Sequence, residues 1–419
     1  MARIAPFRAV HYNNLRFGNE VLRLVAPPYD VIDRSRERKL KEDRLNITYI
    51  TLGNEDDSYA TAAKRLRRWL NDEVMLTDRT ECLYLYEQTF QGIDGKVRMR
   101  TGMVAAVHLE EFSKGVILPH ENTIPGHKAD RRELMEAIGG NTEQIFMLYD
   151  DSTGEVEATI DECRKAEEAL RFIDEDGVHH RIIRVDDEAV IGRMRELLEP
   201  QTMLIADGHH RYETALEYRA GRGPSKNGHD RPFDYVLATL VSFRNPGLVI
   251  NPTHRLVAEV DKDVAGDLKR LLSKEFRLTD FGSHEELLKN LEEGPSGAFG
   301  VWCPSADLRA VAVPKDRHVP EGPLEGLSVY VLQEKVLKGL LGFTTEMLDK
   351  KTNIDYVKDP GAAISKVETG EHAACFFVKP PTVAQVMEVA KAGLKMPHKS
   401  TYFSPKIWSG ALLYLFGEQ

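Results

Sequence analysis

One stretch, residues 203–218 (MLIADGHHRYETALEY), sets the strongest limit on what this chain can fold into. Its first four residues are apolar, and such a short run is typical of a buried strand. Asp207 and Gly208 interrupt the run, and residues 212–218 then carry apolar side chains at helical spacing. The pattern predicts a strand-to-helix turn at residues 207–211, where helix N–H groups and the helix dipole favour an anion.

The residue types of this turn indicate phosphate or metal chemistry. Gly208 permits a close approach by a ligand, and Arg211 supplies a planar fork that suits phosphate or carboxylate. Asp207 stands beside His209, His210 and Arg211, where it could bind a metal or accept a proton. A purely structural turn is the alternative, because Asp-Gly turns are common.

Composition narrows the class of protein. At 419 residues the chain exceeds one ordinary core, so two or three domains are expected. A net charge of −10 argues against a protein surface that binds nucleic acid. The four cysteines form no CxxC pattern, and no segment reaches the roughly 20 apolar residues of a membrane helix. These features, with no signal peptide at the N-terminus, predict a cytoplasmic protein without a membrane partner.

A second polar cluster follows the short apolar run that ends at Pro119. It contains His120, Glu121, Thr123, Lys128 and Arg131, and a helix is expected from Arg131 to Ile138. Glu121 could deprotonate a hydroxyl group, and Lys128 or Arg131 could neutralise charge on a transferred phosphoryl group. A solvated loop before a capped helix is the alternative.

Two further clusters are candidates for substrate binding. One contains His254 and Arg255 within the segment GLVINPTHR, where structural roles are equally compatible with the pattern. The other, residues 396–406, gathers His398, Lys399, Ser400, Thr401 and Lys406 among prolines and aromatic residues. This second segment could close over a phosphate, and a surface loop is its alternative.

Periodicity along the rest of the chain predicts a mixed α/β fold. Alternating residues predict a β-hairpin over 82–109, and a charged helix is expected over 156–170. From residue 261 helices and strands alternate, which is typical of a separate α/β core. We expect three regions: an N-terminal α/β region (1–112), a phosphate-binding core (113–258) and a C-terminal α/β domain (259–419).

Two motifs, Pro119-His120-Glu121 and Asp207-Gly208-His209-His210-Arg211, resemble those of the ParB/sulfiredoxin-like fold. They are most similar to its free serine kinase branch. The resemblance implies that Glu121 and Asp207 are catalytic, and that residues 208–211 contact nucleotide phosphates or a metal. A ParB-like role in binding DNA is not favoured, because the chain is acidic and shows no helix-turn-helix. Sulfiredoxin-like chemistry is not favoured either, because His209 stands where sulfiredoxins have cysteine.

The full length also resembles the family known as domain of unknown function 1015. The segments that carry this resemblance lie at both ends and in the middle of the chain: VAPPYDVI (25–32), PHENT (119–123), KADR (128–131), IADGHHRYETAL (205–216), NPTHRL (251–256) and MPHKSTYFSPK (396–406). The resemblance points to serine or phosphoserine as a substrate.

The leading hypothesis is a Mg²⁺-dependent phosphotransferase that uses ATP or ADP and a small hydroxylated acceptor, with free L-serine as the candidate acceptor. In it Glu121 is the base, Asp207 holds the metal or shares that role, and Lys128, Arg131 and Arg211 spread the transition-state charge. The alternatives are a phosphoserine phosphatase, a nucleotide-sensing protein without turnover and, last, a DNA-binding partition factor. The sequence leaves the oligomeric state open.

Overall fold

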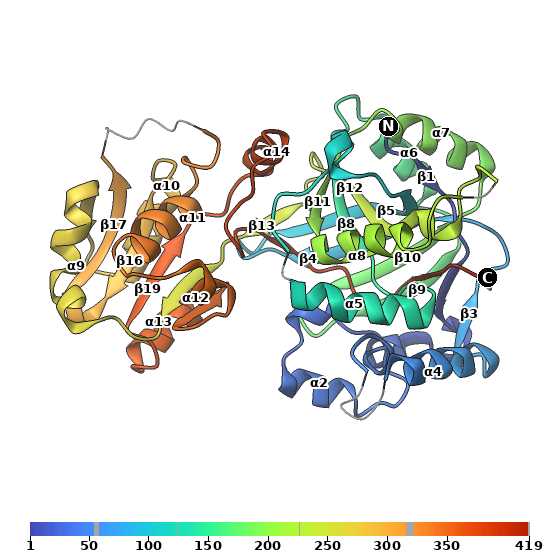
Figure 1. The fold of residues 1–419 in the computed structure, drawn as a ribbon, viewed down its shortest axis with the longest axis horizontal. Helices are drawn as coiled ribbons and strands as arrows, with labels where there is room; N and C mark the ends of the chain where they lie inside the picture. Colours follow the sequence, from blue (N-terminus) through green and yellow to red (C-terminus); the bar gives the residue numbers. More distant parts are fainter. Residues whose placement is uncertain (54–57, 124, 226, 316–321, 418–419) are drawn as a thin grey trace. The chain divides into compact units, whose positions relative to one another are not determined.

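The computed structural model describes residues 1–53, 58–123, 125–225, 227–315 and 322–417 (Figure 1). Contacts divide the chain into two compact units. Unit 1 comprises residues 1–119, 123–248 and 405–419, and unit 2 comprises residues 120–122 and 249–404. The last 15 residues of the chain therefore return to unit 1. The predicted division at residues 112 and 258 stays a prediction.

Unit 1 is built on a large mixed sheet. In order of hydrogen-bonded neighbours, its strands are β6 (Ile117–Leu118), β11 (Met203–Asp207), β8 (Ile145–Tyr149), β12 (Tyr235–Ser242), β5 (Val97–His108), β4 (Leu83–Gln91), β10 (His179–Val185) and β9 (Glu168–Ile173), with β1 (Ile4–Ala5) paired to β5. The β6–β11 and β8–β12 pairs are parallel and the other pairs are antiparallel. β4 and β5 form the predicted hairpin.

A smaller sheet and a set of helices complete unit 1. The smaller sheet runs β3 (Met75–Thr77), β2 (Ala9–Tyr12), β21 (Leu413–Leu415) and β7 (Gly140–Asn141). The α-helices are α1 (Asn14–Phe17), α2 (Arg34–Leu40), α3 (Thr48–Thr51), α4 (Tyr59–Asn71), α5 (Pro125–Ile138), α6 (Glu155–Cys163), α7 (Glu188–Leu198) and α8 (His209–Ala220). α5 and α8 lie side by side (Figure 1). Short 3₁₀ turns lie at Gly18–Arg23, Tyr29–Val31, Phe112–Lys114 and Pro232–Asp234.

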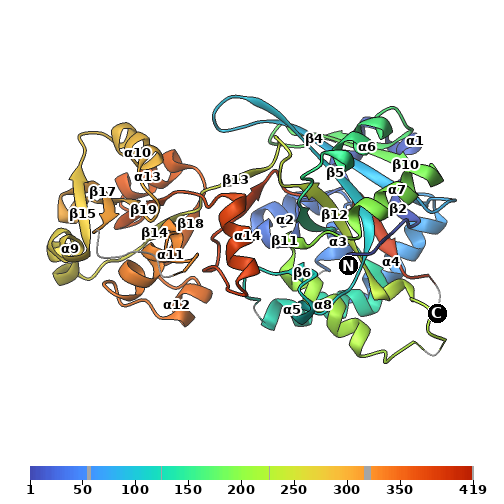
Figure 2. The same ribbon diagram turned by 90° about the horizontal axis from the view of Figure 1, so that it is seen from above.

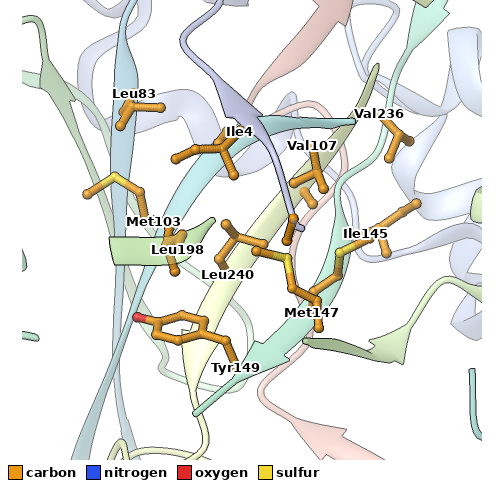
Figure 3. Packing of buried hydrophobic residues seen from close by; sticks show 14 of the residues in the cluster. Ile4, Leu83, Met103, Val107, Ile145, Met147, Tyr149, Leu198, Val236 and Leu240 are labelled. Atoms are coloured by element: carbon orange, nitrogen blue, oxygen red, sulfur yellow. The ribbon is translucent and has the colours of Figure 1, made fainter. Parts of the chain in front are cut away.

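The core of unit 1 lies between the large sheet and α5, α6, α7 and α8. Figure 3 shows side chains of β1, β4, β5, β8 and β12 meeting Leu198 of α7. Tyr212, Ala215 and Leu216 of α8 belong to the same buried cluster. The apolar positions of the 203–218 stretch therefore face this core, which anchors the strand and the helix on both sides of the Asp207–Arg211 turn.

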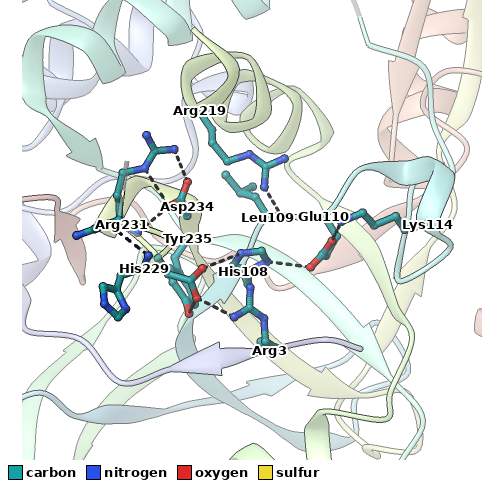
Figure 4. Close-up of polar contacts among 12 residues, drawn as sticks. Arg3, His108, Leu109, Glu110, Lys114, Arg219, His229, Arg231, Asp234 and Tyr235 are labelled. Carbon is teal, nitrogen blue, oxygen red and sulfur yellow. Dashed lines mark hydrogen bonds and ion pairs between the residues drawn. The ribbon is translucent and has the colours of Figure 1, made fainter. Parts of the chain in front are cut away.

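A network of charged and polar side chains lies at one end of β5 (Figure 4). Arg3 Nη1 donates to Asp230 Oδ2 at 2.7 Å, and Tyr235 Oη donates to the same oxygen at 2.8 Å. His108 Nδ1 lies 2.9 Å from Glu110 Oε1. Asp230 Oδ1 also lies 3.7 Å from His108 Nε2, so Asp230 connects Arg3 of the N-terminal segment to β5 and to Tyr235 of β12.

Unit 2 has its own six-stranded sheet and core within the described residues. The sheet runs β15 (Phe276–Asp280), β17 (Leu308–Pro314), β16 (Phe299–Cys303), β19 (Ala374–Val378), β14 (His254–Val257) and β18 (Ile354–Val357), and a separate ribbon pairs β13 (Val249–Asn251) with β20 (Tyr402–Ser404). The helices are α9 (Lys262–Glu275), α10 (His284–Glu293), α11 (Ser328–Val331), a π-helical turn (Leu332–Lys338), α12 (Thr345–Asp349), α13 (Pro360–Glu368) and α14 (Val383–Lys391), and Figure 2 gives a second view of them. α10 and α13 pack on one face of the sheet through Leu287, Leu291, Ala363 and Val367.

The elements confirm the predicted mixed α/β class, with one correction in unit 1. The helix expected over 156–170 ends at Cys163, and residues 168–173 form β9 instead. β9 pairs with β10, and Ala169, Leu170 and Phe172 are buried there. Tertiary pairing of these apolar residues outweighs the helix propensity of the Glu-rich segment before them.

Candidate active site

The predicted strand–turn–helix forms as expected around Asp207. β11 ends at Asp207, and Gly208 is the N-cap residue of α8 with φ of 96°. This left-handed conformation is readily adopted by glycine. A Cβ atom at Gly208 would also lie 3.0 Å from the Arg211 guanidinium. Both facts explain why the sequence places glycine at this turn.

Asp207 is held by two cations. Arg211 Nη2 donates to Asp207 Oδ2 at 2.9 Å, and Lys406 Nζ donates to Asp207 Oδ1 at 2.7 Å. Burial by itself would raise the pKa of the Asp207 carboxyl, but Lys406 and Arg211 outweigh burial and hold that pKa well below its usual value. Both carboxylate oxygens therefore carry a cationic partner, and the predicted roles of Asp207 as a catalytic residue and metal ligand stay predictions.

Arg211 also interacts electrostatically with a second buried carboxylate, that of Glu143. Its Nη1 donates to the Gln144 carbonyl, and its buried Nε has no hydrogen-bond partner among the described residues. Glu143 accepts hydrogen bonds from the Tyr29 backbone N–H at 3.2 Å and from Ser409 Oγ at 2.7 Å. A cavity of about 30 Å³, lined in part by Arg131, Glu143, Arg211 and Thr214, lies here and is large enough for a water molecule.

Arg100 is a buried, positively charged residue that interacts electrostatically with Asp207. Its side chain is 1% exposed, and no described carboxylate forms an ion pair with it. Burial lowers the pKa of Arg100, while Tyr86 and Asp207 raise it. Asp207 thus interacts with three positively charged side chains, Lys406, Arg211 and Arg100, a surplus that favours an anionic ligand.

Lys128 and Arg131, the other predicted phosphate contacts, are paired with carboxylates in unit 1. Lys128 Nζ lies 2.9 Å from Glu213 Oε2 on α8, and Thr123 Oγ1 donates to the same oxygen at 2.6 Å. Arg131 bonds to Asp130 and to the Tyr59 hydroxyl, and its guanidinium lies 4.2 Å from the centre of the Tyr29 ring. Their hydrogen bonds join α5 to its neighbours, and neither residue bonds to Asp207 among the described contacts.

Unit 2 brings together His120, Glu121 and Thr401. His120 Nε2 lies 2.9 Å from Thr401 Oγ1, and this hydroxyl donates to Glu121 Oε1 at 3.3 Å. Since Thr401 gives its proton to Glu121, His120 Nε2–H is the donor to Thr401. His120 is fully buried and Glu121 is 18% exposed. The chain His120–Thr401–Glu121 orients the carboxyl group of Glu121.

Arg255 and Ser400, two other predicted substrate residues of unit 2, bond to backbone carbonyls. Arg255 donates to the carbonyls of Thr253 and Lys399, and burial lowers its pKa to about 10 although Tyr356 and Glu121 raise it. Ser400 Oγ donates to the Pro397 carbonyl. Lys399 has φ of 58° at this turn, and the neighbouring His398 is half-buried. These contacts shape the loop that carries Thr401.

His254 gives a pH-dependent contribution to stability. Its Nδ1 accepts a hydrogen bond from the Val378 N–H at 3.3 Å, which requires neutral imidazole. Burial, reinforced by Arg255, lowers the pKa of His254 to about 4. Between this value and the unfolded pKa of about 6.5 the unfolded state binds more protons, so stability falls as the pH is lowered.

We expect the free energy of unfolding to fall by about 3 kcal/mol through this group when the pH drops from 6.5 to 4. Urea unfolding of the full chain at both pH values measures it. His254→Asn keeps an acceptor and removes the titration, so its pH dependence is expected to be weaker by that amount. His179→Asn, at an exposed histidine, is the control. Equal pH dependence of His254→Asn and the native chain would contradict this assignment.

Two residues of the site, Glu143 and Arg100, lie outside the sequence-based assignments, and a third, Lys406, has a partner that those assignments did not include. Lys406 belongs to the 396–406 cluster, but its pairing with Asp207 was not part of that expectation. Glu143 and Arg100 belong to none of the sequence motifs described above. A signal exists for Arg100, because a charged residue inside a long strand pattern is unusual.

Neither a cluster of metal-ligand side chains nor a helix that could cross a membrane occurs in the described part of the chain. Within the described ranges, no three His, Cys, Asp or Glu side chains gather in a group that could hold a metal ion. No helix in the described part of the chain has both the length and the apolar character that a membrane crossing requires. A Mg²⁺ ion bound mainly by nucleotide phosphates needs only one or two protein carboxylates.

Comparisons with known proteins give one family and several solved structures. The family model described as "Protein of unknown function (DUF1015)" matches residues 4–330. No curated protein matches. A free serine kinase in complex with AMP is 17% identical, with 69% of this chain and 83% of that chain covered and a TM-score of 0.37.

Two other solved structures give similar values. A conserved hypothetical protein from Pyrococcus furiosus is 18% identical, with 70% and 89% of the two chains covered and a TM-score of 0.36. SbnI with C-terminal truncation from Staphylococcus aureus is 10% identical, with 73% and 85% covered and a TM-score of 0.37. Likenesses at these TM-scores establish no activity for this chain.

Proposed function

The chain belongs to the DUF1015 family, and we propose that it is a phosphotransferase whose unit 1 turn binds the phosphates of ATP or ADP. The acceptor in this proposal is a small hydroxylated molecule, with free L-serine as the first candidate. Asp207, Gly208, His209, His210 and Arg211 form the phosphate site, together with Lys406.

The surplus of positive charge around Asp207 carries this proposal. Lys406 and Arg211 occupy both oxygens of one carboxylate, and Arg100 lies buried without an ion pair among the described residues. Arg211 Nε is a buried donor without a described partner. A buried N–H donor without an acceptor is costly, and a phosphate group would supply an acceptor to Arg211 as well as negative charge near the buried Arg100. The N-terminus of α8 adds its dipole.

Glu121 is the proposed general base. In the reaction the acceptor oxygen bonds to phosphorus, the bond from phosphorus to the nucleotide's leaving oxygen breaks, and Glu121 takes the hydroxyl proton. Thr401 and His120 support this role, because Thr401 Oγ1 bonds both to Glu121 and to His120 and so holds the Glu121 carboxyl group in one orientation. Mg²⁺ would enter with the nucleotide phosphates and reduce their charge.

Phosphorus NMR of the full-length protein with Mg²⁺ tests the proposal in separate tubes. One set contains L-serine with ATP or with ADP, and another contains O-phosphoserine alone. We expect phosphoserine to form in the first set and O-phosphoserine to remain intact in the second. Phosphate released only from O-phosphoserine without nucleotide would assign a phosphatase instead. Nucleotide binding without product from serine would redirect the search to another acceptor or to a sensor, and no binding would contradict the proposal.

A further inference from the structure

Arg100 is bonded to a neighbouring strand and to the C-terminal segment. Its Nε donates to Gln88 Oε1 at 3.1 Å, and its Nη2 donates to Gln88 Oε1 and to the Pro405 carbonyl. The guanidinium also lies 4.6 Å from the centre of the Phe146 ring. A glutamine, a backbone carbonyl and an aromatic face therefore surround this buried cation.

Gln88 makes the matching contact to the next residue of that segment. It lies directly opposite Arg100 in the β4–β5 hairpin and is 1% exposed. Its Nε2 donates to the Lys406 carbonyl at 2.8 Å. This cross-strand pair thus holds two consecutive backbone carbonyls, those of Pro405 and Lys406.

The fixed backbone carries the lysine that reaches Asp207. Lys406 Nζ lies 2.7 Å from Asp207 Oδ1, and the lysine side chain is 11% exposed. A free lysine side chain loses much rotamer entropy when it is held in one place, so a fixed backbone makes the ion pair more favourable. We propose that Gln88 and Arg100 form a brace that positions Lys406 on Asp207.

The brace adds two positioning residues from the β4–β5 hairpin to the unit 1 site. Its contribution to phosphate binding rests on the proposed function, but the position of Lys406 does not. Gln88 and Arg100 act through Lys406, whose amine and Asp207 partner are the groups at the turn.

The Gln88→Glu substitution removes the hydrogen bond to the Lys406 carbonyl and keeps the one from Arg100. A carboxylate still accepts from Arg100, but it cannot donate to the Lys406 carbonyl. Gln91→Glu is the matched control, because Gln91 is an exposed glutamine at the end of the same strand and its Nε2 also donates to a backbone carbonyl, that of Gly95.

Amine acetylation of the full chain, read by mass spectrometry, measures the access to Lys406 relative to Lys128. We expect acetylation of Lys406 to rise about tenfold in Gln88→Glu, as expected for the loss of one buried hydrogen bond to this segment. Gln91→Glu is expected to match the native chain. An unchanged relative rate in Gln88→Glu would overturn the brace.

ADP binding by calorimetry in the same samples keeps the two proposals distinguishable. With both correct, Gln88→Glu binds ADP more weakly than the native chain and Gln91→Glu does not. A rise in Lys406 acetylation in a protein that never binds ADP supports the brace and contradicts the proposed function. If the native chain binds ADP but acetylation of Lys406 is unchanged in Gln88→Glu, the proposed function is supported and the brace is contradicted.

Discussion

Glu121→Gln is expected to lower turnover in phosphoryl transfer by about 10²- to 10⁴-fold, the usual contribution of a general base. Glutamine keeps the size of the side chain and can still accept from Thr401 Oγ1. It cannot take the proton of an acceptor hydroxyl at neutral pH. Nucleotide affinity is expected to stay unchanged, because the proposed phosphate site uses residues of unit 1. Initial rates and ADP calorimetry measure the two effects separately.

Glu388→Gln is the matched control for this prediction, since Glu388 is an exposed glutamate on α14 of the same unit. Its turnover is expected to equal that of the native chain. Full turnover in Glu121→Gln would show that another group takes the proton. A parallel loss of ADP binding would place Glu121 in nucleotide binding rather than in proton transfer.

Arg211→Met is expected to lower the free energy of unfolding by about 3–5 kcal/mol, as found when one partner of a buried ion pair is removed. Arg211 is 9% exposed and bonds to Asp207 and to the Gln144 carbonyl. Methionine fills much of the same space, so the main loss is electrostatic. Asp207 keeps Lys406 as a partner. Glu143, whose negative charge raises the pKa of Arg211, loses this nearby positive charge. Urea unfolding at pH 7 measures the change.

Arg68→Met provides a control with the same sequence spacing. Arg68 and Asp72 form an i,i+4 pair at 3.2 Å, but their side chains are 80% and 53% exposed. Such surface pairs contribute about 0.3–0.5 kcal/mol. A similar small loss in both variants would mean that the Asp207–Arg211 pair contributes little to stability. The same Arg211→Met protein is expected to bind ADP more weakly, which links the stability of the turn to the proposed phosphate site.

Local patterns predicted the centre of the site well. The apolar run, the Asp-Gly break and the helical spacing after it correspond to β11, Gly208 and α8. The hairpin of β4 and β5 and the α/β alternation after residue 261 also appear as expected. In each case the apolar period directly reflects which side chains face a core.

The segment after α6 shows where local patterns fail. Residues 164–168 (RKAEE) suit a helix by composition, but α6 ends at Cys163 and β9 starts at Glu168. The strand forms because β10 offers a partner for its hydrogen bonds and a buried surface for its apolar residues. A partner strand supplied by later residues is not part of the local pattern.

The sequence by itself determined the elements whose residues are neighbours along the chain. Asp207 and Arg211 are four residues apart, so the local turn from β11 into α8 brings them together, and Gly208 between them permits that turn. The tertiary structure alone decided the partners of this turn. Lys406 reaches Asp207 across 199 residues, and Arg100 bonds to Pro405 across 305. Such pairings depend on strand order and on the return of the C-terminal segment to unit 1, which no local periodicity encodes.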